Sequence, residues 1–175
     1  KEVDMGKYGT HTVRVANNTT PSECNNDNFS QSACGFVIEF TDIITEAPAV
    51  DDEADRNIEG QLGASDMYIR YMKSDSSEML FKSLPQDLQE IISDTRLLLS
   101  GSNNYQADRG TGFILNNEKL YFLSEKEIYN VEKQNGYENA SRQLDYYAIH
   151  DVSIDKNNSS TYNAEAAIKN YNGVP

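Results

Sequence analysis

The stretch KLYFLSEKEIYNV, residues 119–131, carries the strongest structural signal in the chain. Its first half, LYFL, is a run of large apolar side chains, which is typical of a strand covered on both faces. Ser124 and Glu127 follow with the spacing of a capping box, in which each side chain bonds the backbone N–H of the other residue. We therefore predict a buried strand over 120–123 and a helix that begins at Ser124. This signal concerns architecture and says nothing about chemistry.

Two stretches closer to the N-terminus alternate between apolar and polar residues, as strands do. Residues 10–16, THTVRVA, place Val13 and Val15 on one face and Arg14 on the other, which predicts a strand with one wet side. Residues 36–44, FVIEFTDII, are predicted to form a second strand. Shorter strands are expected at 96–99 and 113–115, and helices at 65–72, 83–94, 138–149 and 164–171.

The composition is that of one acidic, tyrosine-rich domain. The chain has 175 residues, which is long enough for a single domain with a real core. Its hydrophobic share is only 38% and it has no tryptophan, which fits a loop-rich extracellular domain. The net charge of −13 disfavours nucleic acid and anionic membrane surfaces as partners. An acidic surface that keeps the protein soluble is the simplest explanation of this charge.

The ends and the apolar runs of the sequence bear on its location. No apolar run approaches the roughly 18 residues that a membrane span needs, so no membrane insertion is expected. No signal peptide is visible. Because the sequence begins at Lys1 and not at Met, we expect its start to have been processed or cut away.

Cys24 and Cys34 are the two cysteines, and they lie close together in the polar stretch ECNNDNFSQSACG. In an exported protein such a pair is typical of a disulfide that closes a short loop. The alternative is two reduced thiols, one of them buried beside Phe36. A zinc site would need two further ligands, and no other Cys or His lies near in sequence.

Six blocks follow one another along nearly all of the chain: THTVRVANNTTPSEC, FSQSACGFVIEFTDII, LPQDLQEII, KLYFLSEKEIY, RQLDYY and AIKNYNG. In this order they resemble a family of bacterial exported domains of unknown function. Those domains resemble the C-type-lectin-like fold that formylglycine-generating enzymes share with bacterial surface adhesins. The resemblance implies an α+β domain with helices packed on a twisted, mostly antiparallel sheet. It also implies a secreted or cell-surface location, beside neighbouring domains of a larger exported protein.

The chain departs from the family at two places. The family often has an Asn-x-Gly-Gly-Trp segment followed by Ser, a hydrophobic residue and Arg. Here the segment is NIEGQLGASDMYIRYM, so Gln61 or Leu62 replaces the tryptophan, and Tyr68 or a shifted Arg70 replaces the arginine. The family also continues beyond the last block with a tryptophan-rich strand, whereas this sequence ends at Pro175. We therefore expect one lectin-like domain over 1–175. If the family's C-terminal strands are truly missing from the protein, its sheet has an exposed edge that another chain should fill.

Tyrosines among Asn and Ser residues are the candidate ligand-binding groups. The chain has 11 tyrosines, and Tyr105, Tyr146, Tyr147 and Tyr162 lie in its second half in such surroundings. Tyrosine beside Asn and Ser is typical of adaptable protein-binding loops and of platforms on which sugars stack. The alternative is that about half of the tyrosines pack inward through the ring and keep only the hydroxyl wet.

Calcium is the one cofactor that the sequence suggests. Asp51, Asp52 and Asp55 could supply oxygen ligands for it. Their loop lacks the spacing of an EF-hand, and the chain lacks the Glu-Pro-Asn and Trp-Asn-Asp signatures of calcium-dependent sugar-binding lectins. A solvated acidic loop without metal is therefore expected.

His11 and His150 are the only histidines, and each could act as a base near a cysteine or serine. We expect both to be structural. His11 lies on the polar face of a predicted strand, and His150 lies at the C-terminus of a predicted helix, where a cation suits the dipole. The cysteine pair lies near the N-terminus, unlike the catalytic pair of formylglycine-generating enzymes, so that activity is not carried over.

The sequence leaves three functional hypotheses. The first is a non-catalytic extracellular surface or adhesion module that binds a glycan or a protein partner. The second is an enzyme or redox protein of the formylglycine-generating type, which would need a free, reactive cysteine in a cleft. The third is a structural spacer without a ligand.

Overall fold

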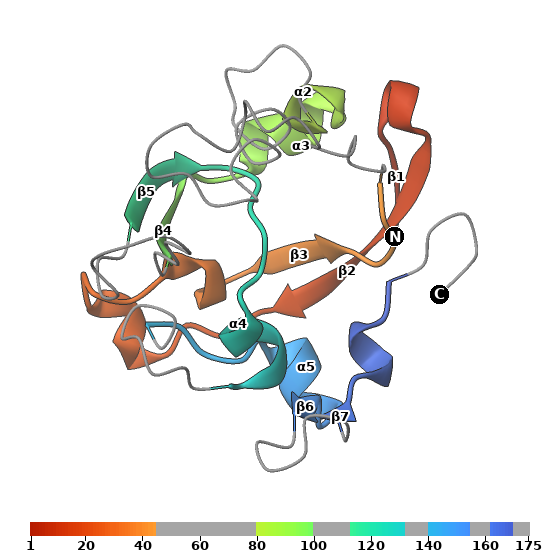
Figure 1. Cartoon of the computed structure of the whole chain (residues 1–175). Helices are drawn as coiled ribbons and strands as arrows, with labels where there is room; N and C mark the ends of the chain where they lie inside the picture. The colour runs from red at the N-terminus through yellow and green to blue at the C-terminus, as the bar shows by residue number, and fades with distance from the viewer. Residues whose placement is uncertain (45–79, 100–112, 132–139, 155–161, 170–175) are drawn as a thin grey trace, which may run out of the picture.

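The structure, a computed structural model, describes residues 1–44, 80–99, 113–131, 140–154 and 162–169 (Figure 1). These ranges contain short helices and antiparallel sheets, so the mixed α+β class is confirmed. The helix predicted over 65–72 lies outside the described residues. So do Tyr105 and the three aspartates considered for calcium, Asp51, Asp52 and Asp55.

The strands of the described ranges form three small antiparallel sheets. The first sheet has the order β1-β2-β3, with β1 at Glu2–Asp4, β2 at Thr10–Asn17 and β3 at Val37–Phe40. The second pairs β4, Thr95–Leu99, with β5, Phe113–Glu118, and the third pairs β6, Ser153–Ile154, with β7, Tyr162–Asn163. The strands predicted at 10–16 and 96–99 are confirmed, and the one predicted at 113–115 extends further.

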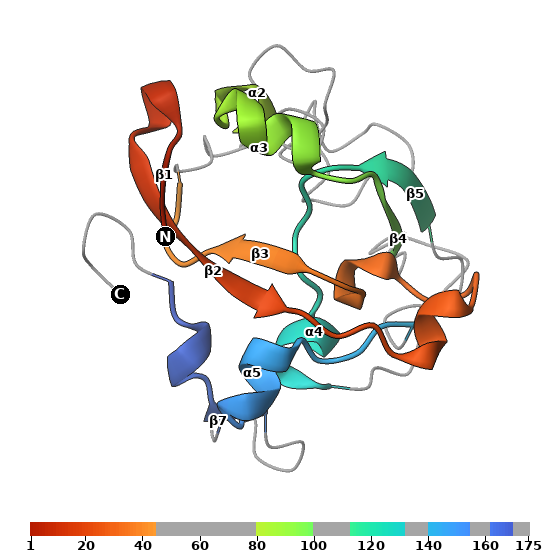
Figure 2. The same cartoon turned by 180° about the vertical axis from the view of Figure 1, so that it is seen from behind.

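The helices are short and lie at two ends of the molecule. Helices α2, Leu80–Ser83, and α3, Gln86–Ile91, are at one end, and α4, Glu125–Tyr129, and α5, Asp145–Ile149, are at the other. Strands β2 and β3 run between the two ends (Figures 1 and 2). Single 3₁₀ turns are η1, Gly6–Tyr8, η2, Ser22–Asn25, η3, Gln31–Ala33, and η6, Glu165–Ala167.

Three predicted helices are shorter than expected. The helix predicted over 83–94 begins at Gln86, and the residue before its first turn is Pro85, not Ser83. The described part of the helix predicted over 138–149 is α5 alone, and the described part of 164–171 contains only η6. Helices of one or two turns have little stability of their own, so tertiary packing sets their length.

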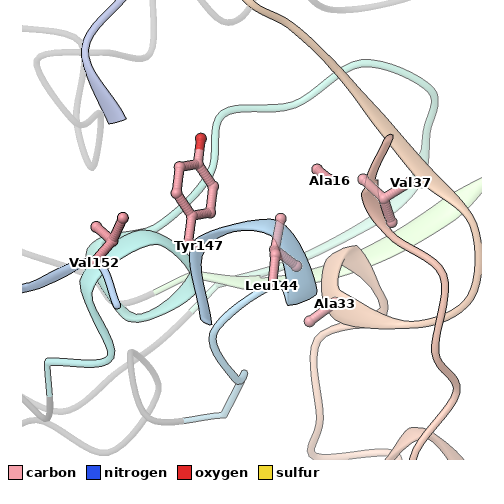
Figure 3. Close-up of a cluster of buried hydrophobic side chains, with 6 residues drawn as sticks. All are labelled: Ala16, Ala33, Val37, Leu144, Tyr147 and Val152. Atoms are coloured by element: carbon pink, nitrogen blue, oxygen red, sulfur yellow. The ribbon is translucent and has the colours of Figure 1, made fainter. Parts of the chain in front are cut away.

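Two clusters of buried apolar side chains form the core. The first consists of Val3, Met5, Leu80, Phe81 and Leu84, and it joins β1 to α2. The second consists of Ala16, Ala33, Val37, Leu144, Tyr147 and Val152 (Figure 3). Its members come from β2, η3, β3, α5 and the residues that flank α5 (Figure 3). The three-stranded sheet therefore contributes to both clusters.

The strand predicted over 120–123 is absent, and this prediction is wrong. These residues carry no strand, and the chain crosses here from β5 to α4 (Figures 1 and 2). Leu120 packs against the first cluster, Leu123 against the second and Tyr121 against both. The apolar side chains of this stretch therefore pack into two core clusters, and they do not belong to a buried strand. Alternation and apolar runs alone cannot distinguish these two cases.

The capping box at the start of α4 is confirmed. The Glu127 N–H donates to Ser124 Oγ at 3.3 Å, and the Ser124 N–H donates to Glu127 Oε2 at 2.7 Å. The helix ends at Asn130, which adopts the left-handed conformation that Asn tolerates (φ 57°). Local sequence therefore decides both ends of this helix.

The buried faces of β2 and β3 differ from those expected. Val15, predicted to lie on the buried face, is 45% exposed, whereas Arg14 is half-buried. On β3 the charged Glu39 is buried and Ile38 is 39% exposed. The reason is tertiary, because α5 packs against the β2–β3 ribbon on the face that carries Arg14 and Glu39.

Candidate functional site

Cys24 and Cys34 form a disulfide, as predicted. Their sulfurs are 2.07 Å apart and their Cα atoms 6.0 Å apart. Because these are the chain's only two cysteines, no free thiol is left. The reduced-thiol and zinc alternatives therefore do not hold. The redox hypothesis lacks the free cysteine that it requires.

The loop closed by the disulfide joins parts of the chain that are distant in sequence. Arg96 on β4 donates to Asp27 Oδ1 at 3.0 Å and to the Asn26 carbonyl oxygen at 3.2 Å. The Ser30 N–H donates to the Ala140 carbonyl oxygen at 2.6 Å. The loop thus holds β4 on one side and the segment before α5 on the other.

Removing the disulfide is expected to lower the free energy of unfolding by about 2–3 kcal/mol, because the open loop gains conformational freedom when the chain unfolds. Urea unfolding of the Cys24→Ser/Cys34→Ser double variant measures this loss. The wild-type protein under a reducing agent serves as the control and should match the variant. A loss well below about 1 kcal/mol would mean that hydrogen bonds alone hold the loop.

Of the predicted binding tyrosines, the structure describes the side chains of Tyr146 and Tyr147, and neither offers an open ring face. Tyr147 is 0% exposed in the second core cluster, so the expectation of a ligand-binding ring at this position is wrong. The half-buried Tyr146 already has stacking partners within the chain. The guanidinium carbon of Arg14 lies 3.7 Å from its ring centroid, and the centroid of the His150 ring lies 4.3 Å away. Tyr162 supplies backbone to β7, and its side chain is outside the described part.

A buried carboxylate that the sequence pattern did not single out connects the sheet to α5. Glu39 is 8% exposed and accepts hydrogen bonds from Arg14 Nε at 2.7 Å, the Tyr147 hydroxyl at 2.7 Å and Lys169 Nζ at 2.9 Å. A charged residue in the middle of the apolar run FVIEF was the available signal. A carboxylate inside a strand of this kind is expected to be paired, because an unpaired buried charge is very costly.

Opposing effects set the pKa of Glu39. Burial alone would raise it, but the hydrogen bond from Tyr147, the charge of Lys169 and the hydrogen bonds from Lys169 and Arg14 outweigh burial and hold the pKa below its usual value. Burial and the Glu39 carboxylate together raise the pKa of the Tyr147 hydroxyl, which therefore stays a donor. At neutral pH every member of the network has a partner of complementary charge or polarity. Because each of these groups already has a partner within the chain, the network suits a structural role.

A second polar cluster connects the loop after β2 to the start of α5. Asp145 accepts the N–H groups of Asn18 at 3.0 Å and Thr19 at 3.1 Å, and Arg142 donates to its other carboxylate oxygen at 3.0 Å. Burial alone would raise the pKa of Asp145, but the Asn18 N–H and Arg142 lower it below its usual value. Arg142 also donates to side-chain oxygens of Asn17 and Thr19.

Acid is expected to destabilise the protein through these two carboxylates. Because folding lowers the pKa of both Glu39 and Asp145, the unfolded chain binds protons more readily than the folded chain. Their contribution to stability is complete above the ordinary values of 4.5 and 3.8, and it is lost as the pH falls through the lower folded values. Urea unfolding in steps from pH 7 downward measures this loss. Asp145→Asn should lose less stability than the wild type over the acid range, and equal losses would contradict the assignment of Asp145.

Glu127 is a second buried carboxylate, 2% exposed, and its described partners are all neutral. Its Oε1 accepts the hydroxyls of Ser32 and, at 2.8 Å, Ser141, while its Oε2 accepts the Ser124 N–H. Burial, together with this carboxylate, raises the pKa of the nearby Tyr121 hydroxyl. The capping glutamate of α4 therefore also joins η3 and the segment before α5.

Both histidines have acceptors as partners. His11 Nδ1 lies 2.7 Å from Asp42 Oδ2, and its Nε2 lies 2.7 Å from the Tyr8 carbonyl oxygen. His150 Nδ1 lies 2.7 Å from the Tyr146 carbonyl oxygen. These contacts support the structural role expected for the two residues.

The described residues contain neither a metal-binding cluster nor a membrane-spanning helix. No group of three or more His, Cys, Asp or Glu side chains among them is placed to hold a metal ion. No helix in these ranges is long and apolar enough to cross a bilayer. The aspartates considered for calcium lie outside these ranges, so the expectation of a metal-free loop stays a prediction.

Comparison with known proteins finds no relative. No family model matches the chain, and neither a curated protein nor a solved structure shows significant similarity to it. The lectin-like family and fold that the sequence blocks imply therefore stay predictions. Function has to be argued from the residues and contacts described above.

Proposed function

We propose that the chain is a non-catalytic module of a secreted or cell-surface protein, and that it binds a protein or a glycan there. The Cys24–Cys34 disulfide carries the proposal, because structural disulfides persist in oxidising compartments and are rare in the cytosol. The C-type-lectin-like fold is part of the proposal. The mixed α+β arrangement with small antiparallel sheets is compatible with it.

The placement of the polar groups supports binding in preference to catalysis. Two of the three described buried carboxylates, Glu39 and Glu127, are each surrounded by donors that belong to the fold, and the third is Glu118. His11 has acceptors at both ring nitrogens. Groups that act as nucleophile or base need access to a substrate, and these groups are engaged with the chain itself.

A protein partner has more support than a glycan. Sugars stack on open aromatic faces, whereas Tyr147 is buried and Tyr146 is stacked by Arg14 and His150. The large apolar side chains that are exposed in the described ranges are mostly aliphatic, which suits contact with a protein. They are Val15, Phe36, Ile38, Ile43, Ile91, Phe122, Ile149 and Ile168.

Two measurements test this proposal. Protease treatment of intact cells that produce the protein should remove it, which would place it outside the cell. The purified, oxidised chain should then be screened on a glycan microarray and against the other surface proteins of those cells by cross-linking with mass spectrometry. Binding at the surface is the expected result. An intracellular location would overturn the proposal, and a surface location without any binding would favour the spacer hypothesis.

A further inference from the structure

The last described segment, residues 164–169, contains η6 and lies beside α5 (Figures 1 and 2). We call this segment the strap. Its described apolar packing against the second cluster comes from Ala166 and Ala167, whereas Ile168 is 52% exposed. Two alanine side chains bury little apolar area, so this packing stabilises the strap only weakly. The polar contacts of the strap therefore decide whether it stays in place.

These polar contacts converge on Glu39. Lys169 Nζ donates to Glu39 Oε2 at 2.9 Å and also to the Phe40 carbonyl oxygen. Arg14 donates through Nη2 to the Ala166 carbonyl oxygen at 3.2 Å, and its Nε donates to Glu39 Oε1 at 2.7 Å. Glu39 thus binds Lys169 directly, and it orients the guanidinium that binds Ala166.

The chain just before the strap has a separate anchor. Asn163 donates through Nδ2 to the carbonyl oxygens of His150, at 3.3 Å, and Asp151, at 3.2 Å, and β7 pairs with β6. These contacts do not involve Glu39. Local opening follows units of the chain that share their contacts. The strap can therefore leave β2 and α5 while its N-terminal end stays attached at Asn163.

The charge of Glu39 balances two cations. Among the described residues, the charged and titratable groups that face it are Arg14 from β2, Tyr147 from α5 and Lys169 from the strap. A proton on Glu39 leaves the two cations near each other without the anion between them, and like charges repel. The Arg14 guanidinium carbon is stacked 3.7 Å from the centroid of the Tyr146 ring, whereas the Lys169 side chain is 31% exposed and can turn into water. The strap is therefore the part that moves.

We propose that the charge of Glu39 holds the strap in place and that a proton on Glu39 releases it, while the rest of the chain stays folded. This inference goes beyond the proposed function, because it concerns a conformational change and not a ligand. Folding holds the pKa of Glu39 below its ordinary value of 4.5, so the strap is held above pH 4.5 and is released as the pH falls through the lower folded value. Release uncovers the part of the second cluster on which Ala166 and Ala167 pack, so acid changes the surface of the protein there.

Amide hydrogen exchange, expressed as protection relative to an unfolded peptide at the same pH, tests this release. The Ala167 N–H, which donates to the Ala164 carbonyl oxygen at 2.8 Å, reports on the strap. The Ala148 N–H, which donates to the Leu144 carbonyl oxygen at 3.0 Å, reports on α5. As the pH is lowered from neutral, protection at Ala167 should fall by about tenfold or more before protection at Ala148 falls. Loss at both amides at the same pH would mean that the chain unfolds as a whole, and it would overturn the proposal.

Variants separate the release of the strap from a general effect of acid. Lys169→Gln removes the charged anchor, so protection at Ala167 should fall by about tenfold or more at neutral pH and should then change little with acid. Lys82→Gln, the same change at an exposed lysine on α2, should behave as the wild type does. Glu39→Gln should open the strap at neutral pH, and if this variant fails to fold, Lys169→Gln decides alone. Unchanged protection at Ala167 in Lys169→Gln, or an equal loss in Lys82→Gln, would overturn the proposal.

Discussion

Replacement of Glu39 by alanine should lower the free energy of unfolding by about 3–5 kcal/mol, a range typical of breaking a buried ion pair. The change leaves Arg14 and Lys169 without their shared carboxylate, and it leaves the buried Tyr147 hydroxyl without its acceptor. Urea unfolding at neutral pH measures the loss. Because a loss of this size is a large part of the stability of a small domain, the variant is also expected to unfold at a clearly lower temperature.

Matched variants test whether the network around Glu39 acts as a unit. Glu165→Ala removes an exposed acid from η6 and should change stability by no more than about 0.5 kcal/mol. Tyr147→Phe should cost about 1–3 kcal/mol on its own, since it removes one hydrogen bond to a charged group. The double variant Glu39→Ala/Tyr147→Phe should lose less stability than the sum of the losses of the two single variants. Simple additivity, or a loss below about 1 kcal/mol for Glu39→Ala, would mean that water replaces the carboxylate at little cost.

Glu127→Ala is expected to have the second-largest effect, a loss of about 3 kcal/mol in the free energy of unfolding. The substitution removes the hydrogen bond from the Ser124 N–H to Glu127 Oε2, which alone is worth about 1 kcal/mol or more, and leaves the Ser124 Oγ cap in place. It also leaves the buried hydroxyls of Ser32 and Ser141 without the acceptor that joins them. The loss should therefore clearly exceed that of Ser124→Ala, which removes the cap but keeps the carboxylate.

The variant Glu127→Gln separates shape from charge. A glutamine can still accept the Ser124 N–H and can donate to the two serine hydroxyls, which rotate freely. It should cost only about 1 kcal/mol. If Glu127→Gln and Glu127→Ala were equally destabilising, the negative charge itself and not the number of hydrogen bonds would hold η3 to α4.

Some interactions could be predicted because they depend on residues close together in sequence. The Ser124–Glu127 capping box spans one helical turn, and Cys24 and Cys34 are separated by 10 positions in a polar loop. Strand alternation over 10–16 likewise needs no information from elsewhere in the chain. In these cases the partners are brought together by the local backbone, so the pattern is sufficient.

The candidate functional groups show the opposite situation. Tyr147 was predicted to be a binding tyrosine like Tyr146, yet it belongs to a core cluster, because β2 packs against α5 and the Tyr147 hydroxyl donates to Glu39. Ile38 lies in the apolar stretch that predicts a strand, yet its side chain is 39% exposed. Residues that are adjacent in sequence can therefore differ in burial, because different distant segments pack against them.

The amino-acid sequence by itself determined the disulfide loop, the ends of α4 and the positions of most described strands. Only the tertiary structure decided which face of β2 and β3 is buried, and that residues 120–123 bridge two clusters without forming a strand. Local structure follows from backbone sterics and from hydrogen bonds between residues close in sequence, so short sequence patterns are enough to predict it. Burial depends on which distant segment packs against a residue, and here α5 covers Glu39 and leaves Ile38 in solvent.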